Sequence, residues 1–286
     1  MKGSGSPPRE KPAPMSLKEI SVADTGDRQS QGKQALKQEC AWHEQVFYVD
    51  SGHWTSGLVF ASRERHWLSG GVEKIRFYGY LAKFIRSAPY FGKAKALIAP
   101  IGTGSEIGYV EALCDSIHGI DISPIALSKC PQHVITRQGD IRMSGYPSDT
   151  FDIVVCPLFL HHVHKVGFDP FVREFFRILK PGGVLAVQEP SIFFLPTALM
   201  RCLRAFLGNV TGLVPDEKPV NPTAVTRCLR QAGFTRVRSI GLSISHARYP
   251  VFLQAISLLI DVPFRRVWPL RLLCNGIGWF CLKPQR

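Results

Sequence analysis

The chain has 286 residues, of which 45% are hydrophobic and 20% are charged, a balance that excludes a wholly disordered protein. Its formal net charge is +13, and the excess is uneven. Residues 1–189 hold 22 basic against 19 acidic side chains, whereas residues 190–286 hold 13 against 3. The last third therefore predicts an anionic partner, which can be a membrane surface, a nucleic acid or a phosphorylated substrate.

The N-terminal residues and the cysteines of the chain indicate its cellular compartment. Residues 1–38 are polar and rich in Pro, Gly and Ser, so we expect a disordered arm there and no secretory signal. The eight cysteines form no C-x-x-C pair, which indicates free thiols in a reducing compartment and predicts a cytoplasmic protein. No stretch holds the ~20 apolar residues of a membrane-spanning helix. Residues 39–286 are expected to form a single domain.

From residue 71 onward, helix and strand signals alternate along the chain. Helices are expected over 71–87, 107–113, the residues after Pro124, 171–179 and 222–232. Strands are expected over 96–99, 117–120, 133–136, 151–156, 184–188, 235–242 and 277–282. This alternation predicts an α/β fold with a doubly wound, mostly parallel sheet of seven strands, whose ligands bind at the carboxyl ends of the strands.

A glycine-rich turn follows the first of these strands, in the sequence Pro100-Ile101-Gly102-Thr103-Gly104. Glycines let the backbone approach a ligand closely, and the helix that begins after the turn offers free N–H groups. Asp121 follows the second strand, 17 residues beyond Gly104, where a carboxylate can accept both hydroxyls of an adenosine ribose. Asp140 follows the third strand, where it can either meet an adenine amino group or cap the loop.

Two further motifs complete the pattern: Phe-Asp-Ile-Val-Val-Cys at 151–156 and Leu-Lys-Pro-Gly-Gly at 179–183. In this order the motifs resemble those of class I S-adenosylmethionine-dependent methyltransferases of the small-molecule type, close to methyltransferase domain 11, over about residues 71–242. The resemblance implies a Rossmann-like core at about 71–189, helical lid insertions at about 190–221 and 245–275, the cofactor S-adenosylmethionine and the product S-adenosylhomocysteine.

The resemblance also assigns roles to individual residues. Those that would line the methionine end and the ribose of the cofactor are Pro100, Ile101, Gly102, Thr103, Gly104 and Asp121. Those that would surround the adenine or lie beside the sulfonium are Ile122, Asp140, Ile141, Pro157 and Leu158. The chain departs from the family at Ile98, where an acid is usual, and at Pro100, where the first glycine is usual. A binding module without catalytic activity therefore stays an open alternative.

Candidate catalytic residues follow the fourth strand, in Leu160-His161-His162-Val163-His164. Histidine titrates near neutral pH, so His161 or His162 can act as the general base for a hydroxyl acceptor. Alternatively, one of them caps the next helix or contacts the cofactor. Histidines at this spacing make poor metal ligands on one helix face, and no carboxylate or cysteine pair completes a site, so no metal is expected.

The sequence after the fourth strand and the last third of the chain limit the classes of molecule that the protein can methylate or bind. Cys156-Pro157-Leu158-Phe159 differs from the Asn/Asp-Pro-Pro-Tyr/Phe motif of enzymes that methylate nucleic acid bases, which makes nucleic acid an unlikely partner. The two insertions combine apolar residues with arginines, as in a lid over the acceptor or in helices that lie on an anionic membrane surface. We therefore expect O-methylation of a hydrophobic, glycosylated or lipid-linked small molecule, in the cytoplasm or at the inner membrane face. N- or C-methylation of a natural product is the alternative.

Overall fold

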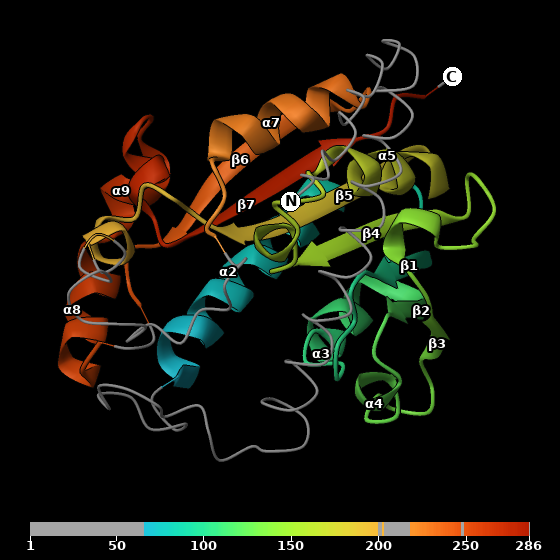
Figure 1. The fold of residues 1–286 in the computed structure, drawn as a ribbon, viewed down its shortest axis with the longest axis horizontal. Coiled ribbons are helices and arrows are strands. Elements are labelled where there is room, and N and C mark those ends of the chain that lie inside the picture. The colour runs from blue at the N-terminus through green and yellow to red at the C-terminus, as the bar shows by residue number, and fades with distance from the viewer. Residues whose placement is uncertain (1–65, 200–201, 203–217, 247–248, 286) are drawn as a thin grey trace, which may run out of the picture.

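A single twisted sheet organises the part of the chain that the computed structural model describes, which is residues 66–199, 202, 218–246 and 249–285 (Figure 1). Its strands are β1 (Ala94–Ile98), β2 (Cys114–Asp121), β3 (Ile135–Gln138), β4 (Phe151–Pro157), β5 (Leu179–Pro190), β6 (Thr235–Ser243) and β7 (Gly276–Leu282). They lie in the order β3-β2-β1-β4-β5-β7-β6, and β7 runs antiparallel to both of its neighbours. The predicted fold class is confirmed.

Helices cover both faces of the sheet, with α5 and α7 on one face and α2 and α3 on the other (Figure 1). The α-helices are α2 (His66–Ile85), α3 (Ile107–Val110), α4 (Pro124–Leu127), α5 (Asp169–Ile178), α7 (Pro222–Gln231), α8 (Val251–Ile260) and α9 (Val262–Arg266). Short 3₁₀ helices are η2 (Glu111–Leu113), η3 (Ile141–Met143), η4 (Leu160–His162) and η5 (Leu270–Leu273). Because β4 has helices on both sides, Phe151 to Cys156 are all buried, as the mostly apolar sequence of this strand predicts.

The elements differ from the expected ones mainly at their ends. The third strand lies two residues later than predicted, and α2 begins at His66 instead of residue 71. Strand β5 begins at Leu179, directly after α5, because Leu179 already pairs with Phe151 of β4, and Gly182 and Gly183 exchange backbone bonds with Lys283. The predicted arm at 1–38 and most of the first insertion lie outside the described residues. The seven cysteines in the described ranges are free thiols.

A crevice for ligands is expected at the edge of the sheet where the strand order reverses, between β1 and β4. Strand β1 pairs with β2 on one side and with β4 on the other, and all three are parallel. The loops that leave β1 and β4 therefore open at the same edge and diverge to opposite sides, which is where doubly wound folds bind ligands. Every residue predicted to form the site lies on β2, on β4 or on a loop at this edge.

Buried charges attach α2 to the C-terminal elements. Arg76 pairs with the fully buried Asp261 and donates to the carbonyl of Leu242 at 2.7 Å. Glu73 is also buried, and its Oε1 accepts from Nδ2 of Asn275 at 3.3 Å. Burial raises the pKa of Glu73 to about 8, so this side chain is protonated in the fold at neutral pH.

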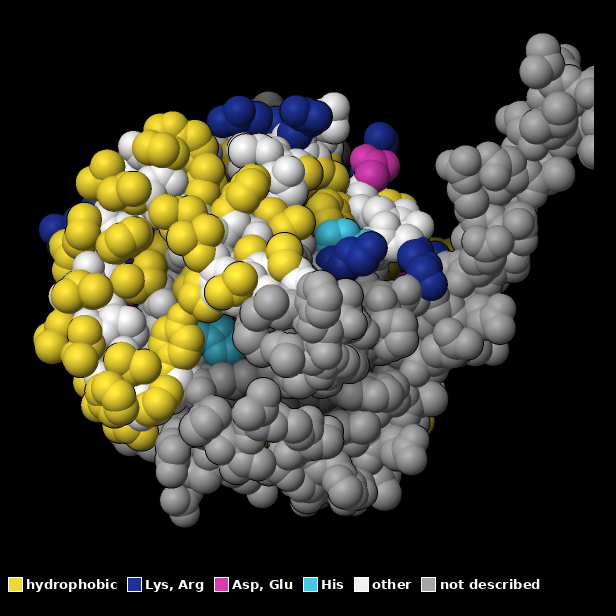
Figure 2. Space-filling view, turned by 60° about the vertical axis from the view of Figure 1, so that its left-hand side comes forward, with side chains coloured by type: hydrophobic (Ala, Val, Ile, Leu, Met, Phe, Trp, Pro, Cys, Tyr) yellow, Lys and Arg dark blue, Asp and Glu magenta, His cyan; other side chains and the backbone are white. Residues whose placement is uncertain are grey.

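Helices α8 and α9 form a projection at one end of the sheet (Figure 1). Their outward side chains are mostly hydrophobic and make a broad apolar surface (Figure 2). In the described ranges, no helix is both long enough and apolar enough to cross a bilayer.

Candidate active site

The glycine-rich loop is fixed by backbone bonds to both neighbouring strands. Ala99 donates its N–H to the carbonyl of Val155 at 2.9 Å, and Ile101 donates to the carbonyl of Ile120 at 3.0 Å. Gly102 and Gly104 then turn the chain with φ values of 54° and 85°, a region that glycine enters at little cost. A Cβ on Gly104 would also lie 2.6 Å from Cδ1 of Ile107. The loop therefore needs a glycine at position 104, as the sequence motif indicates.

Asp121 joins this loop to the end of β2. Its Oδ2 accepts the N–H of Gly102 at 2.8 Å, and its Oδ1 accepts the N–H of Ser123 at 3.0 Å. The side chain is 8% exposed, so the carboxylate is oriented by the backbone at the edge of the crevice. The structure thus brings together the two features that the sequence separates by 17 residues, the glycine turn and its acid.

Gly119 explains how Ile101 fits into the loop. A Cβ on Gly119 would lie only 2.3 Å from Cδ1 of Ile101, so the Ile101 side chain occupies the space above this glycine. Ile101 is 3% exposed and packs in the core between α2 and the sheet. The Ile101 side chain therefore anchors the loop. The contact of Ile101 with the cofactor stays a prediction.

Asp140 and Ile141 are positioned by the loop after β3. The Asp140 carboxylate accepts the N–H of Arg142 at 2.9 Å, which caps η3, and it also pairs with the Arg142 guanidinium. This is the capping role that the sequence leaves open. Ile141 is buried in the core, and Ile122 is half-buried beside Asp121. The contacts of these three residues with an adenine stay predictions.

Glu106 is the first acidic residue after Ile98, the position where the family usually has an acid, and its carboxylate binds α2. Ile98 is fully buried, and Glu106 is 5% exposed at the start of α3. The Glu106 carboxylate lies 2.6 Å from Nζ of Lys74 and accepts from the Tyr78 hydroxyl at 2.7 Å. Because both partners come from α2, Glu106 attaches that helix to the sheet.

A buried carboxylate organises the loop after β4, and sequence reasoning missed it. Glu189, near the end of β5, is fully buried and accepts the backbone N–H of Phe159 at 2.8 Å and that of Leu160. Its Oε2 lies 2.7 Å from Nδ1 of His161. Burial raises the pKa of Glu189 to about 7, although the backbone donors oppose this shift. The available signal is an acid inside an apolar strand next to a proline, Val-Gln-Glu-Pro at 187–190.

His161 and His162 lie together on η4. Their rings have centroids 4.0 Å apart, and His161 is 7% exposed. If the Nδ1–H of His161 donates to Glu189, the Nε2 atom is left as the basic nitrogen of the ring. This arrangement of a carboxylate that orients an imidazole is the one that general-base catalysis uses.

Pro157 and Leu158 connect the strand to this histidine pair. Pro157 is the last residue of β4, and Leu158 has a φ of 50°, which is uncommon for a residue with a side chain. The N–H of Leu158 donates to the carbonyl of Gln188 at 2.7 Å, so β5 holds the unfavourable conformation in place. Such conformations persist where the surrounding structure imposes them, commonly at functional sites.

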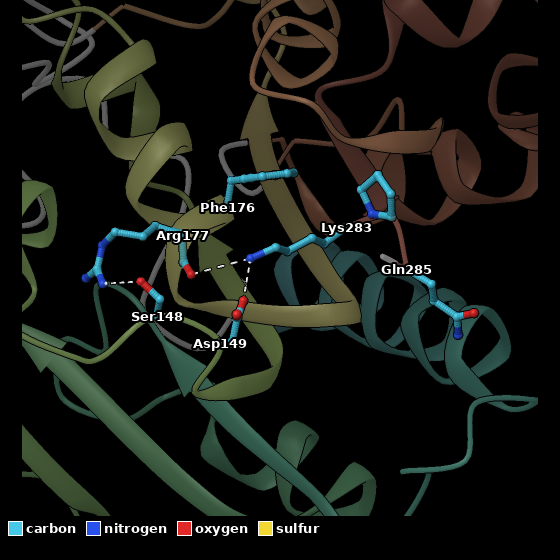
Figure 3. Close-up of a pocket in the computed structure, with 7 residues that line it drawn as sticks. Ser148, Asp149, Phe176, Arg177, Lys283 and Gln285 are labelled. Carbon is cyan, nitrogen blue, oxygen red and sulfur yellow. Dashed lines mark hydrogen bonds and ion pairs between the residues drawn. The ribbon is translucent and has the colours of Figure 1, made fainter.

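A separate cavity of about 420 Å³ lies at the opposite edge of the sheet, at the amino ends of the parallel strands (Figure 3). Lys283 crosses it and binds Oδ1 of Asp149 at 2.7 Å, while Phe176 and Arg177 close one side. None of the predicted site residues lines this cavity. Elsewhere in the described ranges, no group of three or more His, Cys, Asp or Glu side chains is placed to hold a metal ion.

Comparison with known proteins agrees with the geometry. Residues 99–187 match the family model of a methyltransferase domain. A curated protein of Aspergillus luteorubrus named "Probable methyltransferase ltbC" is 28% identical over 176 residues, which are 51% of this chain and 59% of that protein. The chain thus spans less than two thirds of the length of this relative.

Solved structures share the fold. An S-adenosylmethionine-dependent methyltransferase of Thermotoga maritima, described as a possible histamine N-methyltransferase, has a TM-score of 0.53 at 15% identity and covers 77% of this chain and 93% of its own. A phosphoethanolamine N-methyltransferase of Haemonchus contortus, bound to phosphomonomethylethanolamine and S-adenosylhomocysteine, has a TM-score of 0.51 at 14% identity, with coverage of 83% and 59%. Residues 99–187 are thus similar to a methyltransferase domain, and the chain shares the fold of these solved methyltransferases.

Proposed function

We propose that the protein transfers the methyl group of S-adenosylmethionine to a small-molecule acceptor, at a hydroxyl of a hydrophobic, glycosylated or lipid-linked compound. The observation that carries the proposal is Asp121, whose carboxylate is fixed against the N–H of Gly102 at the crevice. A carboxylate beside a glycine turn suits the two hydroxyls of a ribose. The chemistry of this part of the site therefore fits the nucleoside of the cofactor.

Different residues at this crevice bind the cofactor and accept the proton of the acceptor. S-adenosylmethionine, when bound, would supply an electrophilic methyl group on a positively charged sulfur. Asp121 and the loop 100–104 hold the nucleoside, and positioning of this kind supplies much of the rate. His161 takes the acceptor proton on Nε2, and Glu189 keeps the imidazole oriented through Nδ1. The cationic charge of the insertions predicted at about 190–221 and 245–275 favours an anionic membrane surface as an additional partner.

Titration with S-adenosylhomocysteine tests the nucleoside site. We expect saturable binding, and we expect Asp121→Ala to weaken it about tenfold to a hundredfold, since hydrogen bonds to a charged group are lost and the loop loses its anchor. Isothermal titration calorimetry measures the affinity. Asp115→Ala is the matched control, because Asp115 lies on the same strand but is exposed at its other end. No saturable signal from the unmodified protein would refute the enzyme proposal and favour a binding module without this activity.

Two glycine variants test whether Ile101 anchors the loop. Gly119→Ala is expected to weaken binding of S-adenosylhomocysteine about tenfold, because the new methyl group displaces Ile101 and overpacking of this kind costs about 1–3 kcal/mol. Gly108→Ala in α3 is the control, since a Cβ there meets no atom within 4 Å. The same titration compares the two proteins after their thermal unfolding has been recorded. Equal affinities would mean that the loop is held by its backbone bonds alone.

A further inference from the structure

Helix α8 has its polarity reversed relative to an ordinary surface helix. Gln254 is its one fully buried residue and donates to the carbonyl of Tyr249 at 2.8 Å, and the helix is followed by the buried Asp261. In contrast, the apolar side chains of Phe252 and Leu259 are 64% and 79% exposed. A surface helix normally turns its apolar stripe toward the core. The outward face of α8 is therefore built for an apolar medium.

The exposed apolar side chains form one continuous face. Residues 252, 256, 259 and 260 follow helical spacing, and the chain after α9 adds two more exposed hydrophobic residues. We call this face the apolar surface; its members are Phe252, Ile256, Leu259, Ile260, Val267 and Trp268. Figure 2 shows it as a broad hydrophobic area bordered by a group of Lys and Arg side chains. Contiguous apolar area of this kind on a folded protein marks an interaction site.

The described part of the last third of the chain carries exposed charge of one sign only. Between residues 190 and 285, the described residues include a single acidic side chain, Asp261, which is buried and paired with Arg76 and Arg265. The exposed charged side chains of the same ranges are Lys218, Arg227, Arg230, Arg236, Arg238 and Arg266. The described surface of this part of the chain is therefore purely cationic.

Trp268 and Arg271 place an exposed aromatic ring of the apolar surface in contact with a cation. The Arg271 guanidinium carbon lies 4.9 Å from the centroid of the Trp268 ring, which is itself 57% exposed. An aromatic ring with a cation against it suits the boundary between lipid headgroups and acyl chains, where one side is apolar and the other is wet and anionic.

We propose that the apolar surface inserts into the outer part of an anionic bilayer, with α8 lying along the membrane plane and Arg266 and Arg271 at the headgroups. A bilayer supplies both an apolar layer and negative charge, whereas a second copy of the chain would bring the same cationic surface and be repelled. If the bilayer also holds the methyl acceptor, that role rests on the proposed function. The docking of the apolar surface on the bilayer is independent of the proposed function.

Vesicle flotation of the full chain tests the proposal. We expect binding to phosphatidylcholine vesicles that contain phosphatidylserine, weaker binding to phosphatidylcholine alone, and a decrease with added salt. The double variant Leu259→Gln/Ile260→Gln is expected to lose about tenfold or more in binding, because two side chains no longer enter the apolar layer. Arg266→Gln is expected to lose about fivefold on the anionic vesicles only. Ile135→Gln on β3 is the matched control, since Ile135 is 55% exposed and Ile260 is 56% exposed.

Three results would overturn the proposal. One is a wild-type protein that does not float with anionic vesicles, and another is a double variant that floats as well as the wild type. The third is a wild-type protein that does not bind vesicles, together with a double variant that dimerises less or melts at a lower temperature than the wild type. That result would show that a second copy or another segment of this chain covers the surface. Binding of S-adenosylhomocysteine, measured without vesicles, separates this failure from failure of the proposed function.

Discussion

Replacing His161 by alanine is expected to lower turnover about a hundredfold or more and to leave the affinity for S-adenosylhomocysteine within about twofold. The imidazole is buried, and its Nδ1 lies 2.7 Å from the carboxylate of Glu189, so the fold prepares one ring nitrogen to accept a proton. His162→Ala is expected to have a smaller effect, because the imidazole whose Nδ1 lies 2.7 Å from the Glu189 carboxylate is that of His161. Single-turnover kinetics and calorimetry on the same samples separate the chemical step from cofactor binding.

His164→Ala is the control for this comparison, since His164 lies on the same loop and its Nε2 faces the carbonyl of Lys218. Glu189→Gln then tests the orienting carboxylate as a positioning residue: the shape is kept and the negative charge is lost, so turnover should fall about tenfold with cofactor affinity unchanged. Unchanged turnover in both His161→Ala and His162→Ala would remove the general base. The acceptor would then be an amine or a carbon that needs no such base, or catalysis would rest on positioning alone.

Much of the site could be predicted because it depends on local sequence and on one rule of topology. Gly104 is required by a positive φ and by the contact of a Cβ with Ile107, and both needs belong to the turn itself. Asp121 could be added because parallel neighbouring strands end at the same edge of a sheet. Strands β1 and β4 were predicted for the same reason, since each is a short, mostly apolar and buried run that a turn follows.

The remaining features depend on contacts between residues far apart in the sequence. Glu189 reaches the loop of His161 only because β4 and β5 pair in register from Ile153 to Pro157, which no local pattern reveals. Glu106 bonds to Tyr78 and Lys74 of α2, about thirty residues earlier, which its place after the glycine turn does not reveal. Helix α8 was expected as part of a lid, but the reversal of its polarity needs the burial of Gln254 and Asp261, which tertiary structure alone decides.

The buried Glu73 predicts an unusual dependence of stability on pH. Burial raises its pKa from an ordinary value near 4.5 to about 8, with the nearby Asp261 adding to the shift and Asn275 and Arg76 opposing it. Between these values the folded protein keeps a proton that the unfolded chain releases. Since the folded state binds more protons, the free energy of unfolding should fall as the pH rises from about 5 to 8, by an amount on the order of 3 kcal/mol.

Glu73→Gln is expected to remove most of this slope, because glutamine is neutral at every pH and fills the same space beside Gly276, where a Cβ would lie 2.9 Å from Oε2 of Glu73. A smaller slope should persist up to about pH 7, because Glu189 is buried in the same way. Urea unfolding between pH 5 and pH 8 measures both proteins, with Glu111→Gln, an exposed carboxylate on η2, as the control. Parallel stability curves for wild type and Glu73→Gln would show that Glu73 is ionised in the fold, and the pairing of Arg76 would then have to extend from Asp261 to this second carboxylate.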